Sequence, residues 1–482
     1  MGGDFDVIVV GAGLSGIGAA CHLAMKCPDK SYAILEARGA IGGTWDLFRY
    51  PGIRSDSDMY TLGYAFRPWV EAKAIADGPA IRAYVEETAR EHGVTPHIRF
   101  GHKVARAQWS SERALWTVEA ETAEGPRAFT CRFLMMCSGY YSYAEGHRPD
   151  FPGEERFAGR LVHPQFWPED LDYAGKRVVV IGSGATAVTL VPEMAKSAAH
   201  VVMLQRSPTY IVSRPSVDAI AERLKRRLPP MLAYRLTRLK NVALQMFFFR
   251  LARRRPARVK AKMIEMVRDE LGPDYDVAAH FTPAYNPWDQ RVCLVPDGDL
   301  FEAIREGRAS VATGTIESFT EGGIRLASGE EIAADIVVTA TGLKVNLLGE
   351  AEIVVDGARQ DLSQAIAYKA IMFSGVPNLA YVFGYTNASW TLKADLAADY
   401  VCRLIRHMDA KGYASATPVP GPDVRPVPFL DFTSGYVRRA LAVLPRQGDR
   451  APWRLRQNYA FDLVTLKRGR IEDGALRFRR AA

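Results

Sequence analysis

The sequence has few of the features that mark secreted, metal-binding or membrane-spanning proteins. Its six cysteines, in a chain of 482 residues, form no CxxC pair and have no histidine at metal-ligand spacing. This pattern opposes a disulfide framework, a redox dithiol and a zinc site, so we expect buried thiols and no metal. The first residues, MGGDFDVIVVGAG, form a strand-like segment where a signal peptide would have a cationic and then an apolar region. We therefore expect a cytoplasmic protein.

Long uncharged apolar runs are scarce as well. The one long run, residues 370–392, is interrupted by Gly, Pro and Asn, which opposes a membrane-spanning helix. We expect a buried strand there, followed by the start of a helix. A chain of this length exceeds one ordinary hydrophobic core, so two or three domains are expected.

The net charge of +8 comes from a single segment. Between Asp218 and Glu270 there are 15 Lys and Arg against 5 Asp and Glu. The segment also has apolar residues at helical spacing, followed by three phenylalanines; the apolar positions are Leu232, Leu236, Leu239, Ala243 and Met246. We expect a basic helical insertion over residues 215–285 that packs this stripe on its own protein. The alternative is weak peripheral contact with a membrane surface. Nucleic acid is not expected as a partner, because no binding motif accompanies the charge.

Near the N-terminus, an apolar strand runs into a glycine turn and then a helix. Gly11, Gly13 and Gly16 have the GxGxxG spacing, in which glycines allow a tight turn and close approach of a pyrophosphate to backbone N–H groups. The next strand ends in Glu36, 20 residues after the last glycine, where a carboxylate can accept both ribose hydroxyls. Strand, turn, helix and acid together predict a dinucleotide site.

The same pattern recurs in the middle of the chain. Gly182, Gly184 and the small Ala187 follow a second apolar strand, and the strand after them ends in Gln205 and Arg206. An arginine in place of the acid suits the 2′-phosphate of NADPH. The alternative for Arg206 is a solvated surface side chain.

These two sites predict an α/β fold with two Rossmann-like dinucleotide-binding domains, the first for FAD and the second for NADPH. The chain would cross between them at residues 133–142 and return at 334–342, each a buried strand that ends in a glycine. The FAD-binding domain would then be discontinuous, comprising 1–147 and 335–482. The NADP-binding domain would comprise 148–334, including the helical insertion.

A four-residue motif between the two glycine turns identifies a family. Phe157, Gly159, His163 and Trp167 fit FxGxxxHxxxW, and the chain thereby resembles the type I Baeyer–Villiger monooxygenases, which are class B flavoprotein monooxygenases. Within them it is most similar to the ethionamide-activating branch. Related N- and S-oxygenating enzymes usually end this motif in Tyr or Phe. In the family, this segment joins the two domains, and its His and Trp are thought to couple nicotinamide binding to flavin chemistry. For His163 alone, a buried histidine packed on an aromatic ring would be the alternative.

The resemblance also implies roles for individual residues. FAD would contact Ser15, Glu36, Thr44, Trp45, Asp46, Leu47, Asp56 and Val104. NADPH would contact Arg54, Ser183, Gly184, Ala185, Thr186, Ala187, Val188, Thr189, Arg206 and Ser207. Arg291 matches the active-site arginine, with Asp56 as its carboxylate partner and a structural ion pair as the alternative. Many members have Lys before that arginine and this chain has Gln290, which weakens the expected preference for NADPH.

The implied activity is that of an FAD- and NADPH-dependent Baeyer–Villiger monooxygenase. It would insert one atom of O2 next to a ketone carbonyl to give an ester or lactone, and would oxygenate thioether or thiocarbonyl sulfur. The oxygen would be transferred from a C4a-peroxyflavin stabilised by Arg291. Near the flavin, a helix capped by Asn387 or Ser389 could point its N-terminus at the ring, and Trp453 could belong to a closing loop or to the core.

Three other functions remain open at this point. An N- or S-oxygenating flavin monooxygenase without Baeyer–Villiger activity is opposed by Trp167 and Arg291. A disulfide reductase of the same architecture is opposed by the missing CxxC. A redox-inactive binding protein recruited through the basic helices is opposed by the two intact glycine turns.

Overall fold

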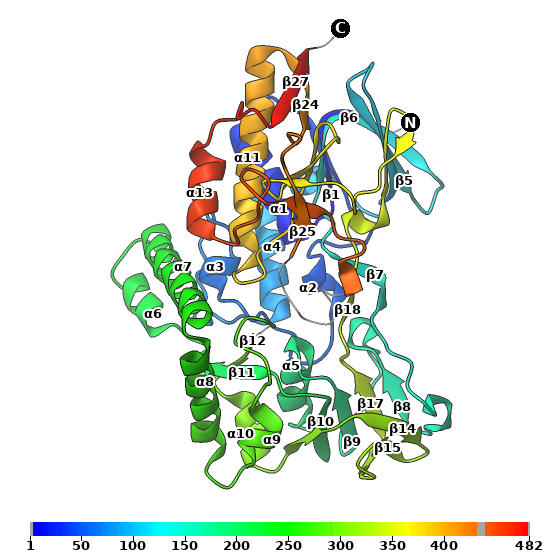
Figure 1. The fold of residues 1–482 in the computed structure, drawn as a ribbon, viewed down its shortest axis with the longest axis vertical. Coiled ribbons are helices and arrows are strands. Elements are labelled where there is room, and N and C mark those ends of the chain that lie inside the picture. The colour runs from blue at the N-terminus through cyan, green and yellow to red at the C-terminus, as the bar shows by residue number, and fades with distance from the viewer. Residues whose placement is uncertain (1–2, 291, 431–438, 481–482) are drawn as a thin grey trace.

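The computed structural model describes residues 3–290, 292–430 and 439–480. These residues form two α/β units, one above the other in Figure 1, each built around a sheet of its own. In each unit, a glycine turn and a helix lie in sequence between two strands that pair in parallel. The predicted α/β fold with two Rossmann-like units is confirmed.

The larger sheet takes its eleven strands from both ends of the chain. Its main path runs β20-β19-β4-β5-β6-β1-β2-β3, and β23 lies beside β6 and continues to β22 and β21. The strands from the N-terminal part are β1 (Asp4–Val10), β2 (Tyr32–Leu35), β3 (Ile98–Arg99), β4 (Lys103–Ser110), β5 (Leu115–Glu121) and β6 (Arg127–Met136). Those from the C-terminal part are β19 (Glu352–Val355), β20 (Ala358–Arg359), β21 (Ala367–Tyr368), β22 (Met372–Phe373) and β23 (Leu379–Tyr381).

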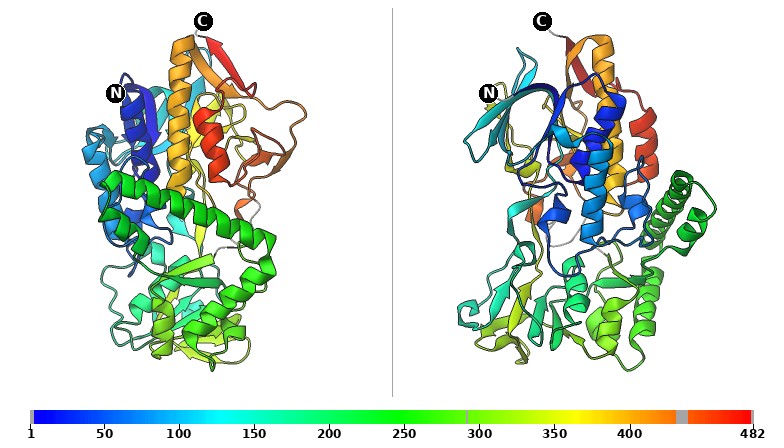
Figure 2. Two further views of the ribbon diagram at one scale, coloured as in Figure 1. Left: turned by 90° about the vertical axis from the view of Figure 1, so that its left-hand side faces the viewer. Right: turned by 180° about the vertical axis from the view of Figure 1, so that it is seen from behind.

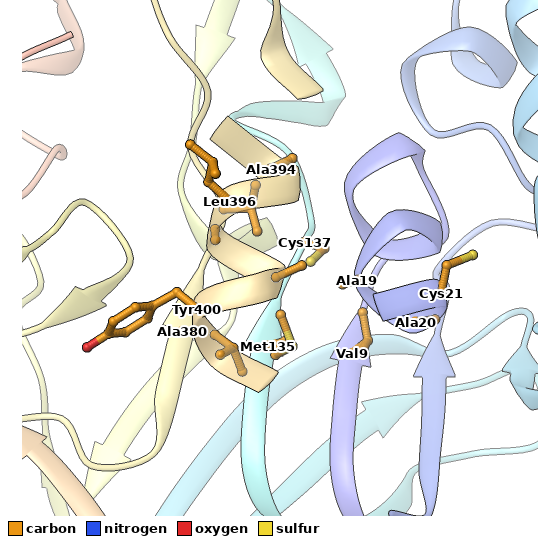
Figure 3. Packing of buried hydrophobic residues seen from close by; sticks show 14 of the residues in the cluster. Val9, Ala19, Ala20, Cys21, Met135, Cys137, Ala380, Ala394, Leu396 and Tyr400 are labelled. Carbon is orange, nitrogen blue, oxygen red and sulfur yellow. The ribbon is translucent and has the colours of Figure 1, made fainter. Parts of the chain in front are cut away.

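Helices from both ends of the chain cover one face of this sheet. Val7 and Val9 of β1 pack in one cluster with α1 (Leu14–Lys26) and α11 (Trp390–Lys411), whereas Ile8 and Val10 pack in a second cluster with β4, β5 and β6. Both faces of β1 are therefore covered, as its unbroken apolar run predicts. Figure 3 shows the first cluster, where side chains of α1 and α11 meet β1 and β6. Further helices of this unit are α2 (Thr44–Leu47), α3 (Met59–Leu62), α4 (Gly78–Glu91) and α13 (Tyr459–Arg468).

The smaller unit has a five-stranded sheet in the order β13-β10-β9-β17-β8, parallel throughout. Its strands are β8 (Arg160–Val162), β9 (Arg177–Ile181), β10 (His200–Gln205), β13 (Ala309–Thr313) and β17 (Ile336–Thr339), and its helices next to the sheet are α5 (Ala185–Met194) and α10 (Asp299–Arg305). A three-stranded antiparallel sheet is attached, with β14 (Ile316–Thr320), β15 (Gly323–Leu326) and β16 (Glu331–Ala333).

The expected return of the chain at residue 335 needs correction. β17 pairs with β9 and β8, so this strand completes the smaller sheet before the chain goes back. The actual crossing is made by β7 (Tyr141–Gly146) and β18 (Leu343–Val345), which pair antiparallel. Sequence patterns miss this boundary because a buried apolar strand looks the same in either sheet.

Four helices form the insertion that the basic segment predicts: α6 (Ala219–Lys225), α7 (Pro230–Arg254), α8 (Pro256–Leu271) and α9 (Val277–Phe281). They lie between β11 (Tyr210–Arg214) and β12 (Val292–Pro296), which pair with each other. In the left view of Figure 2, α7 runs across the molecule between the two units.

The expected burial of the apolar stripe on α7 is wrong. Leu232, Leu236 and Leu239 are exposed, and the buried face instead carries Arg238 and Asn241. Arg238 donates from Nη1 to the carbonyl oxygens of Tyr60 at 2.9 Å and Gly63 at 2.7 Å. These buried polar contacts determine which face of α7 turns inward, because an unpaired guanidinium inside the protein would be costly.

Expectations about the cysteines, about metal sites and about membrane-spanning helices can also be compared with the structure. All six cysteines are buried thiols. No group of His, Cys, Asp and Glu in the described ranges could hold a metal ion. Within the same ranges, no helix is both long and apolar enough to cross a membrane.

Candidate functional site

The first glycine turn packs so closely that side chains are excluded. Gly11, with φ of +103°, follows β1, and a Cβ placed on it would lie 2.7 Å from the carbonyl oxygen of Cys137. A Cβ on Gly16 would lie 1.7 Å from the carbonyl oxygen of Gly11. Gly13 is the N-cap of α1 and has no side chain to occupy the first-turn N–H groups, which leaves that helix end open to an anion.

Glu36 follows β2 and points at this turn. One of its carboxylate oxygens accepts the N–H of Ala12 at 2.6 Å, and the other accepts the N–H of Arg38 at 2.8 Å. The side chain is buried, and burial raises the pKa of Glu36, although both backbone hydrogen bonds oppose that rise. The acid predicted from spacing alone therefore lies beside the turn, as a ribose-binding carboxylate requires.

One cavity of about 620 Å³ runs from this turn to the smaller unit. Its walls include the start of α1, Glu36, and Ala185 and Thr189 of α5. The predicted site residues that line it are Gly11, Gly13, Ser15, Glu36, Thr44, Trp45, Arg54, Asp56, Val104, Ala185 and Thr189. Both predicted dinucleotide sites thus contribute to a single cavity.

Several predicted cofactor contacts are not among the lining residues of this cavity. They are Gly16, Asp46, Leu47, Gly182, Ser183, Gly184, Thr186, Ala187, Val188, Arg206 and Ser207. Asp46 is the clearest case, since its buried carboxylate lies 2.6 Å from Arg38, 3.3 Å from Arg49 and 2.9 Å from Arg82. In this structure Asp46 binds three arginines, of which Arg38 lines the cavity.

Aromatic residues that the sequence analysis did not single out form much of the wall. Tyr140 stacks on Trp390 with ring centroids 5.1 Å apart, and the indole N–H of Trp390 donates to Ser15 Oγ at 2.7 Å. Tyr140, Tyr141 and Tyr143 follow the end of β6, and all three line the cavity with Trp390. Their signal in the sequence is the run GYYSY directly after an apolar strand, a place where parallel sheets bind ligands.

The helix at this wall begins as the sequence suggests, with one difference. Ser389 is the N-cap of α11, but its hydroxyl is hydrogen-bonded to Thr61 Oγ1 at 2.6 Å and makes no capping bond. Asn387 donates to the carbonyl oxygen of Gln457 at 2.9 Å. Trp453 is buried and makes an edge contact with Tyr368, so it is a core aromatic.

The second glycine turn follows β9 in the smaller unit. Gly182 has φ of +137°, and a Cβ on it would lie 2.4 Å from the carbonyl oxygen of Ala340. Gly184 is the exposed N-cap of α5, with nothing within 4 Å of an added Cβ. The turn therefore combines a required glycine with an open helix N-terminus.

The two residues at the end of β10 have different environments. Gln205 is buried and donates from Nε2 to the carbonyl oxygen of His280 at 2.7 Å and to Thr313 Oγ1 at 3.0 Å. The next two residues, Arg206 and Ser207, are exposed. They follow the end of β10, which pairs with β9, the strand before the glycine turn. Arg206 thus lies where the resemblance expects a 2′-phosphate contact, while Gln205 is structural.

Arg54 and Asp56 belong to a loop of the larger unit that contacts the smaller unit. Arg54 forms an ion pair with Asp299 at the start of α10, and its Nη2 donates to the carbonyl oxygen of Val188 at 3.4 Å. Asp56 is half-buried and lines the cavity, as does Leu294 of β12. Arg291, the predicted catalytic arginine, lies outside the described residues.

The FxGxxxHxxxW residues surround β8 at the edge of the smaller sheet. A Cβ on Gly159 would lie 2.4 Å from both Phe157 Cζ and the carbonyl oxygen of Asp335. His163 accepts the N–H of Gln165 at 3.2 Å through Nδ1, and burial lowers its pKa. Its ring lies against Gly146, whose added Cβ would be 2.0 Å from Cε1. Trp167 packs on the core of the smaller unit.

None of these four motif residues lines the cavity, yet the motif contacts the strand that crosses between the units. Gln165, two residues after His163, donates to the carbonyl oxygen of Ser142 at 2.9 Å. Ser142 belongs to β7 and lines the cavity. The geometry therefore connects the motif to the cavity through the β7–β18 pair.

Comparisons with known proteins agree with this architecture. A family model described as flavin-binding monooxygenase-like matches residues 75–246, and one described as an NAD(P)-binding Rossmann-like domain matches residues 9–74. The chain is 56% identical over 475 residues to the FAD-containing monooxygenase EthA of Mycobacterium tuberculosis, a match that covers 98% of this chain and 97% of the other. It is 53% identical over 486 residues to the putative FAD-containing monooxygenase MymA of the same organism, covering 99% and 98%. A solved oxidized steroid monooxygenase bound to NADP has a TM-score of 0.72 at 26% identity, covering 86% of this chain and 88% of the other.

Proposed function

Because the chain belongs to the family of FAD-containing, flavin-binding monooxygenase-like enzymes, we propose that it is an FAD- and NADPH-dependent Baeyer–Villiger monooxygenase. It inserts one atom of O2 beside the carbonyl of a small ketone to give an ester or lactone, and it oxygenates thioether or thiocarbonyl sulfur. The single cavity shared by both glycine-turn units supports this proposal, because reduction and oxygen transfer need both cofactors at one place.

The residues around the first turn fit FAD. The open N-terminus of α1 suits a pyrophosphate, and the buried carboxylate of Glu36 suits a ribose diol. The stacked Tyr140 and Trp390 supply flat apolar surface next to Ser15. We therefore assign FAD to the larger unit.

The residues around the second turn fit NADPH. The open N-terminus of α5 suits the second pyrophosphate, and the exposed Arg206 suits the 2′-phosphate. Ala185 and Thr189 on the same helix line the shared cavity, and so does Asp56. When bound, NADPH supplies a hydride and FAD supplies the activation of O2.

We assign the stabilisation of negative charge to Arg291 and the orientation of that arginine to Asp56. A guanidinium is permanently charged and forked, so it can stabilise negative charge that develops on oxygen during transfer to the carbonyl. Asp56 lines the cavity, as does Leu294 three residues after Arg291 in sequence.

Replacing Arg291 by Ala tests this assignment. Arg291→Ala is expected to retain FAD and to be reduced by NADPH, because hydride transfer depends mainly on nicotinamide positioning. Ester formation from a ketone is expected to fall about a hundredfold, the usual cost of removing a preorganised donor of negative charge. Arg291→Lys should restore little, since it keeps the charge and loses the fork.

The measurements are FAD content, the rate of flavin reduction without oxygen, and ester yield, with Gln290→Ala as the neighbouring control. Ester formation near the wild-type rate in Arg291→Ala would show that this arginine has a structural role. Oxidation of a thioether without any ester from a ketone in the wild-type enzyme would favour the N- or S-oxygenating alternative.

A further inference from the structure

The outward face of α7 is apolar over most of its length. Leu239 is 67% exposed and Phe247 is 58% exposed, and Ile220 on the adjacent α6 is 55% exposed. The exposed large apolar side chains on the two helices are Ile220, Leu232, Leu236, Leu239, Leu244, Phe247 and Phe248. We call these seven residues the apolar face. Exposed large apolar side chains gathered on two adjacent helices mark an interaction site on a folded protein.

The inward contacts of α7 hold this face outward. Arg238 forms an ion pair with Asp395 at 3.6 Å, in addition to its bonds to backbone carbonyl oxygens. Asn241 donates from Nδ2 to Asp58 Oδ1 at 2.9 Å. Rotating α7 to bury its leucines would leave Arg238 and Asp395 without these partners, at a high cost in free energy. The exposure of the apolar face is therefore built into the fold.

Most charges around the apolar face are positive; the exceptions are Asp218 and Glu222 on either side of Ile220, which pair with Lys240 and Lys225. From Arg223 to Ile264 the sequence has 14 Lys and Arg and no Asp or Glu. Among the described residues, no ion pair engages Arg235, Arg250 or Arg254, which are all exposed on α7. Long basic side chains beside exposed Leu and Phe are the pattern of helices that lie in a membrane interface.

We propose that the apolar face and the basic residues around it bind the surface of an anionic lipid bilayer, with α7 lying parallel to the membrane plane. Leucine and phenylalanine side chains would enter the acyl region while the arginines meet lipid phosphates. A second copy of the chain is a poorer occupant, because a symmetric contact would oppose two strongly basic surfaces. Nucleic acid is also a poorer occupant, because it would leave the leucines of the apolar face exposed.

Vesicle flotation of the FAD-loaded, full-length protein tests this proposal. The vesicles are phosphatidylcholine alone or phosphatidylcholine with phosphatidylglycerol. Wild-type protein is expected to float with the anionic vesicles and much less with the neutral ones. The triple variant Leu236→Ser, Leu239→Ser, Phe247→Ser should bind the anionic vesicles at least about tenfold more weakly, because interfacial binding scales with buried apolar area.

A matched triple variant changes three exposed apolar residues elsewhere: Met25→Ser, Phe100→Ser and Val464→Ser. It should float like the wild type. A charge variant, Arg235→Gln, Arg250→Gln, Arg254→Gln, should lose its preference for anionic over neutral vesicles. FAD content and the thermal unfolding midpoint show that each variant is folded.

Two results would overturn the proposal. One is wild-type protein that does not float with anionic vesicles. The other combines two observations. The wild type self-associates in sedimentation velocity without lipid while the first triple variant does not, and neither of these two proteins binds vesicles. In that case the apolar face would be an interface between copies of this chain.

Discussion

Replacing Glu36 by Gln removes one negative charge from the cavity wall and leaves the side-chain shape almost unchanged. The carboxylate accepts the Ala12 N–H at 2.6 Å and the Arg38 N–H at 2.8 Å through different oxygens. An amide has only one acceptor oxygen, so one of these bonds is lost. A hydrogen bond to a charged group is worth about 1.5–3 kcal/mol. Burial raises the pKa of Glu36, which shows that the charge also carries a desolvation cost, and this cost disappears in Glu36→Gln.

We therefore expect the apoprotein of Glu36→Gln to lose only about 1–2 kcal/mol of unfolding free energy. FAD binding should suffer more, because a neutral amide cannot accept both ribose hydroxyls as strongly as a carboxylate. Loss of about 1.5–3 kcal/mol corresponds to a roughly 10- to 100-fold higher Kd. The assays are urea unfolding of the apoprotein and titration with FAD followed by flavin fluorescence.

Glu350→Gln is the control, since Glu350 lines the same cavity but is half-exposed. Its effect on the Kd for FAD should be small. If Glu36→Gln binds FAD as tightly as the wild type, the adenosine ribose does not lie at Glu36 and the assignment of the larger unit is refuted. A loss of apoprotein stability above about 4 kcal/mol would identify Glu36 as mainly structural.

Three further outcomes are expected. Arg206→Ala should raise the KM for NADPH far more than that for NADH, and equal effects in steady-state kinetics would remove the 2′-phosphate assignment. Burial holds the pKa of His163 below 6.5 in the folded protein, so the unfolded chain binds the proton first and stability is lost as pH falls below 6.5. Urea unfolding at about pH 7.5 and about pH 5.5 should show a smaller loss for His163→Gln than for the wild type, and identical losses would contradict this account. Asp46→Ala should cost about 2–3 kcal/mol of unfolding free energy, because three arginines lose a buried carboxylate; a loss below about 0.5 kcal/mol would show that water replaces it.

Local patterns in the sequence were sufficient to predict the two glycine turns and the position of Glu36 next to the first one. A glycine turn and the acid about 20 residues later lie within one βαβ unit, so their spacing fixes their relation in space. Glu36 beside Ala12 is the result. The position of Arg206 after β10 follows from the same local logic.

Features that depend on contacts between distant segments could not be found in this way. The contact of Asp46 with Arg82 and the pairing of Arg54 with Asp299 join residues from different elements. The orientation of α7 is the strongest example, since helical spacing showed an apolar stripe but could not show which side meets the protein. That side was decided by Arg238, which bonds the carbonyl oxygens of Tyr60 and Gly63, 178 and 175 residues away in sequence.

The division of the larger sheet between the two ends of the chain also determines the order of events during synthesis. β6 is complete at residue 136, but its neighbour β23 begins at residue 379 and α11, which packs on α1, ends at residue 411. A growing chain gains roughly 5–20 residues per second, so β6 waits on the order of ten seconds or more for these partners. During that interval the smaller unit is already synthesised through β17 and can fold first. The wall formed by Trp390 is added late, and the lining residues Leu430, Ala440 and Leu444 are added later still. The cavity therefore closes only on nearly finished chains, and cofactor loading becomes a late step in biogenesis.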